Sequence, residues 1–124
     1  MTLPLALVFY EDLIPGSQLV NRLQDSKYRV QVVSKLEELF DSAAHAGPML
    51  IFADLVSRNG NVCAVIQKLR NEKATAHIPV IGFVDDGDEA LQAAGRSAGA
   101  KLVVADSVIL THLTQFVEQA LQLE

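Results

Sequence analysis

Acidic residues that directly follow apolar runs are the side chains of this sequence best placed to do chemistry. Asp54 closes the run 49–53, and the pair Glu11-Asp12 follows the run 5–10. Apolar runs of this length, bounded by turn residues, are typical of strands buried on both faces of a parallel sheet. Because open α/β sheets bind their ligands at the carboxyl ends of the strands, these acids indicate a site at that edge.

The chemistry that three such acids would support is the binding of a hard divalent cation. Mg²⁺ takes oxygen ligands and usually keeps several waters, so two or three carboxylates suffice to hold it. Asp12 and Asp54 are the candidate direct ligands, and Glu11 would assist through a water molecule.

Four more acids follow the later apolar runs. Asp85 and Asp106 come directly after two of them, and Asp86 and Asp88 lie just beyond the first. Carboxylates that converge repel one another, and a cation or protonation must relieve the repulsion. The alternative for Asp85, Asp86 and Asp88 is that they are solvated or cap the helix expected from residue 88, where negative charge is favourable.

The composition bounds the class of protein. A chain of 124 residues with half of them hydrophobic is expected to form one domain, residues 1–124, with a substantial core. The net charge of −5 without a basic stripe argues against nucleic-acid binding, and no apolar run is long enough to span a membrane. A single cysteine, Cys63, and an N-terminus without a secretory pattern favour the cytoplasm.

Apolar strand-like runs alternate with stretches of helical period along the whole chain. The expected strands cover about residues 4–10, 29–33, 49–54, 78–84 and 102–105, and the expected helices begin near residues 15–17, 34, 61, 88 and 108. Five strands alternating with five helices predict an α/β fold with a parallel sheet and right-handed crossovers. At this length, the doubly wound, flavodoxin-like strand order 2-1-3-4-5 is the leading candidate.

Local signals predict where the helices begin and end. Ser34 with Glu37 three residues later forms the pattern of a capping box at the start of the second helix. Gly47 is expected to end that helix, and Asn61 to cap the third. Pro15 suits the first helical turn, where a missing N–H costs nothing.

The order and spacing of these features resemble the receiver domain of response regulators in two-component signalling. The resemblance rests on the acidic pair Glu11-Asp12, on Asp54 and the ungapped stretch to Arg70, on Ile78-Pro79-Val80-Ile81, and on Ala98-Gly99-Ala100. It covers essentially the whole chain. It implies a (βα)₅ receiver fold and a bacterial phosphorelay setting.

The resemblance also implies roles for individual residues. Asp54 would accept a phosphoryl group from a histidine kinase or a small phosphodonor. Glu11, Asp12 and Asp54, with the backbone carbonyl of Val56, would hold Mg²⁺. A hydroxyl that ends the fourth strand and a lysine that ends the fifth contact the phosphoryl oxygens in the family.

This sequence departs from the family at the positions that stabilise the phosphoryl group. The hydroxyl position is Val84 and the lysine position is Asp106, so a cation has become an anion. The proline that usually follows the third strand is Arg58, and the aromatic residue of the fifth strand is Val103. Because phosphoryl transfer depends on positioning and charge neutralisation, these changes disfavour an aspartyl phosphate, unless Arg58 supplies the missing charge.

The sequence therefore predicts a divergent receiver, or pseudo-receiver, that is not an enzyme. It would act by protein–protein contacts, with phosphorylation at Asp54 weak or absent and any Mg²⁺ weakly bound. A histidine kinase or downstream signalling protein would bind the face formed by helix 88–98, strand 102–105 and helix 108–122, and a homodimer is the alternative. The competing functions are a working receiver, phosphorylated at Asp54 with Mg²⁺, and a small metal-dependent phosphatase.

Overall fold

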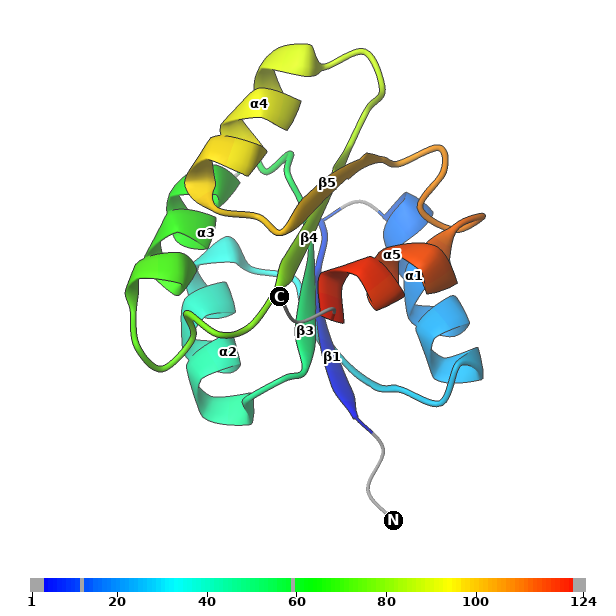
Figure 1. Ribbon diagram of the computed structural model, residues 1–124, viewed down its shortest axis with the longest axis horizontal. Coiled ribbons are helices and arrows are strands. Elements are labelled where there is room, and N and C mark those ends of the chain that lie inside the picture. Colours follow the sequence, from blue (N-terminus) through cyan, green and yellow to red (C-terminus); the bar gives the residue numbers. More distant parts are fainter. Residues whose placement is uncertain (1–3, 12, 59, 122–124) are drawn as a thin grey trace.

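Five parallel strands form a single sheet at the centre of the computed structural model, which describes residues 4–11, 13–58 and 60–121 (Figure 1). The strands are β1 (Leu5–Phe9), β2 (Arg29–Val33), β3 (Leu50–Asp54), β4 (Val80–Val84) and β5 (Leu102–Ala105). Their spatial order is β2-β1-β3-β4-β5, with every neighbouring pair parallel. The predicted fold class and strand order are confirmed.

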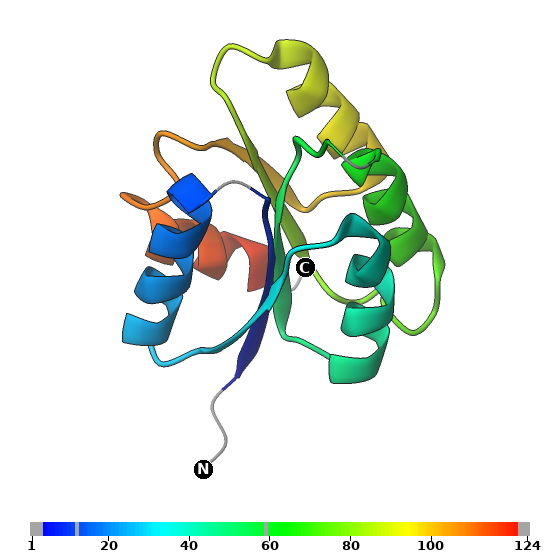
Figure 2. The same cartoon turned by 180° about the vertical axis from the view of Figure 1, so that it is seen from behind.

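Helices cover both faces of this sheet. They are α1 (Leu13–Asp25), α2 (Leu39–Ala46), α3 (Val62–Asn71), α4 (Glu89–Ala98) and α5 (Leu113–Leu121), with a short 3₁₀ helix η1 (Leu36–Glu38) before α2. Figures 1 and 2 show α1 and α5 on one face, and α2, α3 and α4 on the other. No helix in the described ranges is long and apolar enough to cross a membrane.

The central strand β3 is buried on both faces, which explains why its sequence is continuously apolar. Leu50 and Phe52 pack into the core beneath α1 and α5, whereas Ile51 and Ala53 pack into the core beneath α2, α3 and α4. All four side chains are fully buried. Asp54, the next residue, is half-buried at the edge of the sheet.

Three predicted helix boundaries are confirmed by their hydrogen bonds or backbone angles. Gly47 ends α2 in the left-handed conformation, with φ of 58°. The Asn61 side chain accepts a hydrogen bond from the Ala64 N–H at 3.2 Å, and Asp88 likewise accepts from Leu91 at 3.0 Å. These caps fix the start of α3 and of α4 at the carboxyl edge of the sheet.

The predicted capping box at Ser34 and Glu37 is wrong. Lys35 is extended, with φ of −117° and ψ of 122°, and η1 begins only at Leu36. Ser34 therefore stands two residues before the first helical turn, and neither cap position before η1 or α2 makes a side-chain hydrogen bond. Burial of Leu36 and Leu39 decides where the turns form, and it overrides the local polar signal.

Other boundaries shift by a few residues. The last helix begins at Leu113 instead of residue 108, because residues 106–112 form turns that bury Ile109 in the core. The first helix begins at Leu13, so Pro15 still lies in its first turn, where its N–H would have had no helical partner. β1 is shorter than the expected 4–10, and β4 begins at Val80, after Pro79.

Candidate functional site

The carboxyl edge of the sheet brings together the ends of the strands that carry the candidate acids. In the strand registers Phe9 pairs with Ala53, Asp54 with Phe83, and Val84 with Ala105. Glu11, Asp54, Asp85 and Asp106 therefore leave the sheet on the same edge. Asp12 lies outside the described residues, so its predicted metal role stays a prediction.

The Asp54 carboxylate is anchored to the loop that follows it. Its Oδ1 accepts a hydrogen bond from the Val56 N–H at 3.0 Å, which is the geometry of an Asx turn. Val56 itself is 49% exposed, although it is a large apolar residue. The loop after β3 thus begins with a backbone turn that the acidic side chain organises.

Both carboxylate oxygens of Glu11 accept hydrogen bonds from this same loop. The Ser57 hydroxyl donates to Oε2 at 2.6 Å, and the Arg58 backbone N–H donates to Oε1 at 2.8 Å. Hydrogen bonds to an ionised acceptor are short and about twice as strong as neutral ones. Glu11 therefore ties the end of β1 to a loop 46 and 47 residues further along the chain.

These contacts bear on whether the described residues fit Mg²⁺. Glu11 would have to exchange the Ser57 and Arg58 donors for a metal or for its water, and Asp54 already accepts from Val56. Within the ranges 4–11, 13–58 and 60–121, no group of three or more acidic, histidine or cysteine side chains is arranged to hold a metal ion. Glu11 and Asp54 are therefore the described carboxylates at the predicted cation position, and the third predicted acid, Asp12, lies outside the described residues.

A second acidic group lies at the ends of β4 and β5. Burial, followed by the negative charges of Asp85 and Asp86, raises the pKa of Asp106, and a backbone hydrogen bond from Ser107 partly opposes the rise. The Ser107 hydroxyl also donates to Asp86 Oδ1 at 2.8 Å. Asp106, at the position where the resemblance implies a lysine, is thus a carboxyl group close to two other carboxylates.

The other acids of this edge divide between capping and loop formation. Asp88 caps α4, as the sequence predicts. Asp85 accepts from the Gly87 N–H at 2.9 Å and so organises its own turn rather than the helix, while Asp86 accepts from Ser107. Of Asp85, Asp86 and Asp88, only Asp88 therefore caps a helix through its side chain.

The remaining departures from the family pattern also have defined surroundings. Val84 is 2% exposed, so the position of the expected hydroxyl is filled by buried methyl groups. Arg58 is an exposed residue, and its backbone N–H donates a hydrogen bond to Glu11. Val103 is half-buried and packs against the core beneath α3 and α4.

One contact beside Asp54 had no signal in the sequence. Leu55 is 3% exposed and inserts between two glycines, Gly82 in β4 and Gly95 in α4. A Cβ atom added at either glycine would lie 2.9 Å from a methyl carbon of Leu55. The residue after the candidate phosphoacceptor is therefore packed tightly between strand β4 and helix α4, which only the tertiary structure reveals.

The sheet order, the helices on both faces and the acidic carboxyl edge define a flavodoxin-like fold of the receiver type. Solved structures with this fold cover nearly the whole chain. A protein from Chloroflexus aurantiacus provisionally described as a response regulator superposes with a TM-score of 0.89 at 20% identity, covering 97% of this chain and 98% of its own. A response regulator from Burkholderia multivorans gives 0.76 at 24% identity, with 99% and 98% covered.

A chemotaxis protein from Vibrio cholerae has a TM-score of 0.84 at 14% identity, covering 96% of this chain and 99% of its own. The sequence matches no protein-family model and no curated protein. The comparisons therefore establish the receiver fold, and the function has to be argued from the site.

Proposed function

We propose that this protein is a signal-transduction module, a divergent receiver that works by protein–protein interaction with little or no phosphorylation at Asp54. The fold shared with response regulators supports a role in two-component signalling. The chemistry of the carboxyl edge supports the divergent assignment. In this proposal the protein has no enzymatic activity.

The main support for this proposal is that Asp106, where the resemblance implies a lysine, lies among other carboxylates. A phosphoryl group on Asp54 would add negative charge to an edge where burial, and then the negative charges of Asp85 and Asp86, already raise the pKa of Asp106. Phosphoryl transfer is catalysed chiefly by positioned positive charge. An acid in place of the cation raises the free energy of both the transition state and the aspartyl phosphate.

Two further contacts support the same proposal. Buried Val84 offers no hydroxyl that could bind a phosphoryl oxygen and draw β4 toward the site. Glu11 accepts hydrogen bonds from Ser57 and Arg58, so a metal ligand role for Glu11 would compete with contacts that hold the loop after β3.

The proposed partner surface is the face formed by α4, β5 and α5. β5 is the last strand of the sheet, and α4 presents several small, exposed side chains such as Ala90, Ala93 and Ala94. Small side chains let another backbone approach closely. A histidine kinase or a downstream signalling protein is the proposed partner, and a second copy of the chain is the alternative.

The test is incubation with acetyl phosphate and Mg²⁺, followed by intact-protein mass spectrometry. In the reaction a carboxylate oxygen of Asp54 attacks phosphorus, the bond to the acetyl oxygen breaks, and acetate leaves. We expect little or no phosphoryl adduct on the natural sequence. We expect a larger adduct fraction in Val84→Thr/Asp106→Lys, because these changes supply the missing hydroxyl and cation.

Asp54→Asn on each background is the matched control, and it should abolish any adduct. A stable adduct on the natural sequence that Asp54→Asn removes would overturn the proposal in favour of a working receiver. Turnover of an aryl phosphate by the natural sequence would instead identify a phosphatase. We expect none, since no nucleophile paired with a general acid is evident among the described residues.

A further inference from the structure

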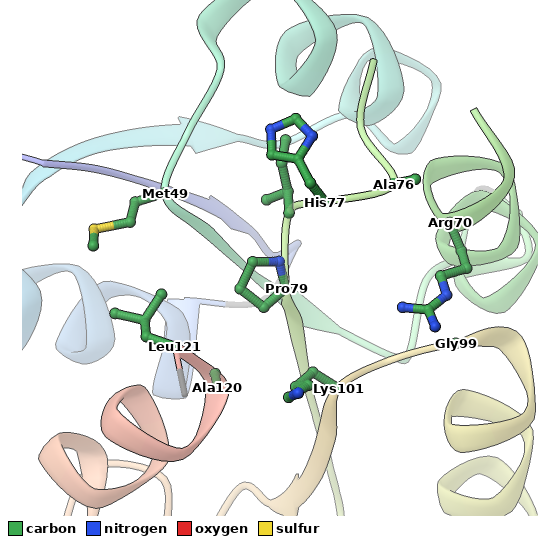
Figure 3. Close-up of a pocket in the computed structure, with 10 residues that line it drawn as sticks. Met49, Arg70, Ala76, His77, Pro79, Gly99, Lys101, Ala120 and Leu121 are labelled. Carbon is green, nitrogen blue, oxygen red and sulfur yellow. The ribbon is translucent and has the colours of Figure 1, made fainter. Parts of the chain in front are cut away.

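A pocket lies at the amino-terminal edge of the sheet, opposite the acidic edge, and its volume is about 260 Å³. It is lined by residues that lead into β3, β4 and β5 and by the last turns of α3 and α5. Figure 3 shows that the side chains of Arg70 and Lys101 extend into the space beside Pro79. No acidic residue of the described ranges lines it.

The structure fixes the position of the Arg70 side chain. Gly99 follows α4 with φ of 114°, a conformation that favours glycine. A Cβ atom there would lie 3.0 Å from Arg70 Cγ, so the aliphatic stem of Arg70 packs against the Gly99 backbone. This packing holds the stem, and the exposed guanidinium reaches the pocket. Lys101, the residue directly before β5, also lines the pocket.

The opposite wall of the pocket is apolar. Met49, Pro79 and Leu121 line it, and Met49 is 46% exposed. Large apolar side chains that stay this exposed are few in the described ranges, since Val32 and Val56 are the other two. A ligand that covered Met49 would therefore remove apolar surface from water.

We propose that this pocket binds a small organic carboxylate with an apolar body. The carboxylate would lie between Arg70 and Lys101, and the apolar body against Met49, Pro79 and Leu121. The volume falls just below the range of about 300–1,000 Å³ typical of sites for drug-sized ligands, so a short ligand fits and a nucleotide does not.

The electrostatic field of the helix ends at this edge of the sheet affects how strongly the pocket would bind a carboxylate. Helices α3, α4 and α5 end here, and each carboxyl end carries a partial negative charge of about half a unit. These partial charges weaken the attraction but do not cancel two full positive charges. We therefore expect a dissociation constant on the order of 1 mM.

The experiment is a titration of ¹⁵N-labelled protein with hexanoate, followed by NMR of the backbone amides. We expect saturable shifts at Gly99, Lys101 and the neighbours of Met49. The variant Arg70→Gln/Lys101→Gln should weaken binding at least fivefold, and both residues are exposed, so the fold should persist. The matched control is Arg96→Gln, which removes an exposed cation from the last turn of α4 outside the pocket, and it should change binding less than twofold.

Four results would overturn this proposal. Equal shifts with hexan-1-ol would mean that the pocket is merely apolar, and equal shifts with inorganic phosphate would mean that it attracts any anion. Absence of saturable shifts, or full binding by the double variant, would also overturn it. None of these outcomes depends on phosphorylation at Asp54.

Discussion

Asp106 is the residue at which this chain differs most in chemistry from a phosphorylated receiver. The resemblance to receivers aligns it with a lysine, and its pKa is raised by burial and by the negative charges of Asp85 and Asp86. A carboxyl group whose pKa is higher in the folded state than in the unfolded state favours folding only when it is protonated. At neutral pH, Asp106 therefore opposes the stability of the fold.

The resulting prediction is a pH-dependent gain in stability for Asp106→Asn. The amide keeps the shape and can still accept the hydrogen bond from Ser107, but it carries no charge. We expect the free energy of unfolding to rise by up to about 0.5 kcal/mol at pH 7, because Asp106 is only partly buried and solvent screens much of the charge. The gain should shrink as the pH falls through the folded pKa of Asp106 and vanish below its unfolded value, 3.8.

Urea unfolding of both proteins between pH 3 and pH 7 measures this difference. Asp25→Asn, on the far side of the molecule at the end of α1, is the matched control, since it removes one negative charge away from the acidic edge. A loss of stability at pH 7, or a gain of the same size at every pH, would contradict the assigned cause.

At the residue scale, the sequence predicts which acids reach the carboxyl edge but not what they contact there. Position along an apolar run is enough to place Asp54 at a strand end. The partners of Glu11 are 46 and 47 residues away and include a backbone N–H, which every loop residue except proline offers. No residue-type pattern singles out such a bond.

At the scale of elements, the loop after β3 packs closely against helix α4 through Leu55. Leu55 fills the space that the missing side chains of Gly82 and Gly95 leave open. Glycine in a helix interior is normally unfavourable by about 1 kcal/mol relative to alanine, so its presence in α4 requires a packing reason. Leu55 supplies that reason.

We therefore predict that Gly95→Ala destabilises the protein despite its better helix propensity. The added methyl group would press on Leu55 and on Val103, whose Cγ2 would lie 3.1 Å away. Overpacking of this kind typically costs about 1–3 kcal/mol. Thermal or urea unfolding measures the change, and Ser97→Ala, at an exposed position of the same helix, should be neutral or slightly stabilising.

A double-mutant cycle identifies the contact responsible. Leu55→Ala alone should cost about 2–5 kcal/mol because it leaves a cavity. In the double variant Leu55→Ala/Gly95→Ala the new methyl group partly fills that cavity, so the combined cost should be clearly less than the sum. Simple additivity would show that Leu55 is not what makes glycine necessary at position 95.

The elements also show where sequence patterns succeed and fail. Strands predicted from apolar runs lie within two residues of their observed ends, because burial on both faces demands such runs. Caps at Asn61 and Asp88 are confirmed, since one side chain and a nearby N–H decide each of them. The cap at Ser34 fails, because packing of Leu36 and Leu39 against the core delays the helix.

At the scale of the whole molecule, acids gather at the carboxyl edge of the sheet, and two cations line the pocket at the other edge. The carboxyl edge carries Glu11, Asp54, Asp85, Asp86 and Asp106, whereas Arg70 and Lys101 face the pocket at the other edge. Cations in solution should gather at the acidic edge whether or not a specific metal site exists there.

The acids at the carboxyl edge give a prediction for how Mg²⁺ changes the stability of the whole fold. A ligand that binds only the folded state raises the free energy of unfolding by RT ln(1 + [L]/Kd). Because both carboxylate oxygens of Glu11 already accept hydrogen bonds from the loop after β3, we expect Mg²⁺ to raise the melting temperature no more than NaCl of equal ionic strength. Both salts should stabilise slightly by screening the acidic edge.

Asp54→Asn distinguishes screening from coordination. Under screening alone, the variant should respond to both salts almost as the natural sequence does, since only one of several acids has been removed. A stabilisation specific to Mg²⁺ that disappears in Asp54→Asn would reveal a metal site built with Asp12, and it would favour the working receiver. Such a result would not affect the proposed carboxylate pocket, because Arg70 and Lys101 lie at the other edge of the sheet.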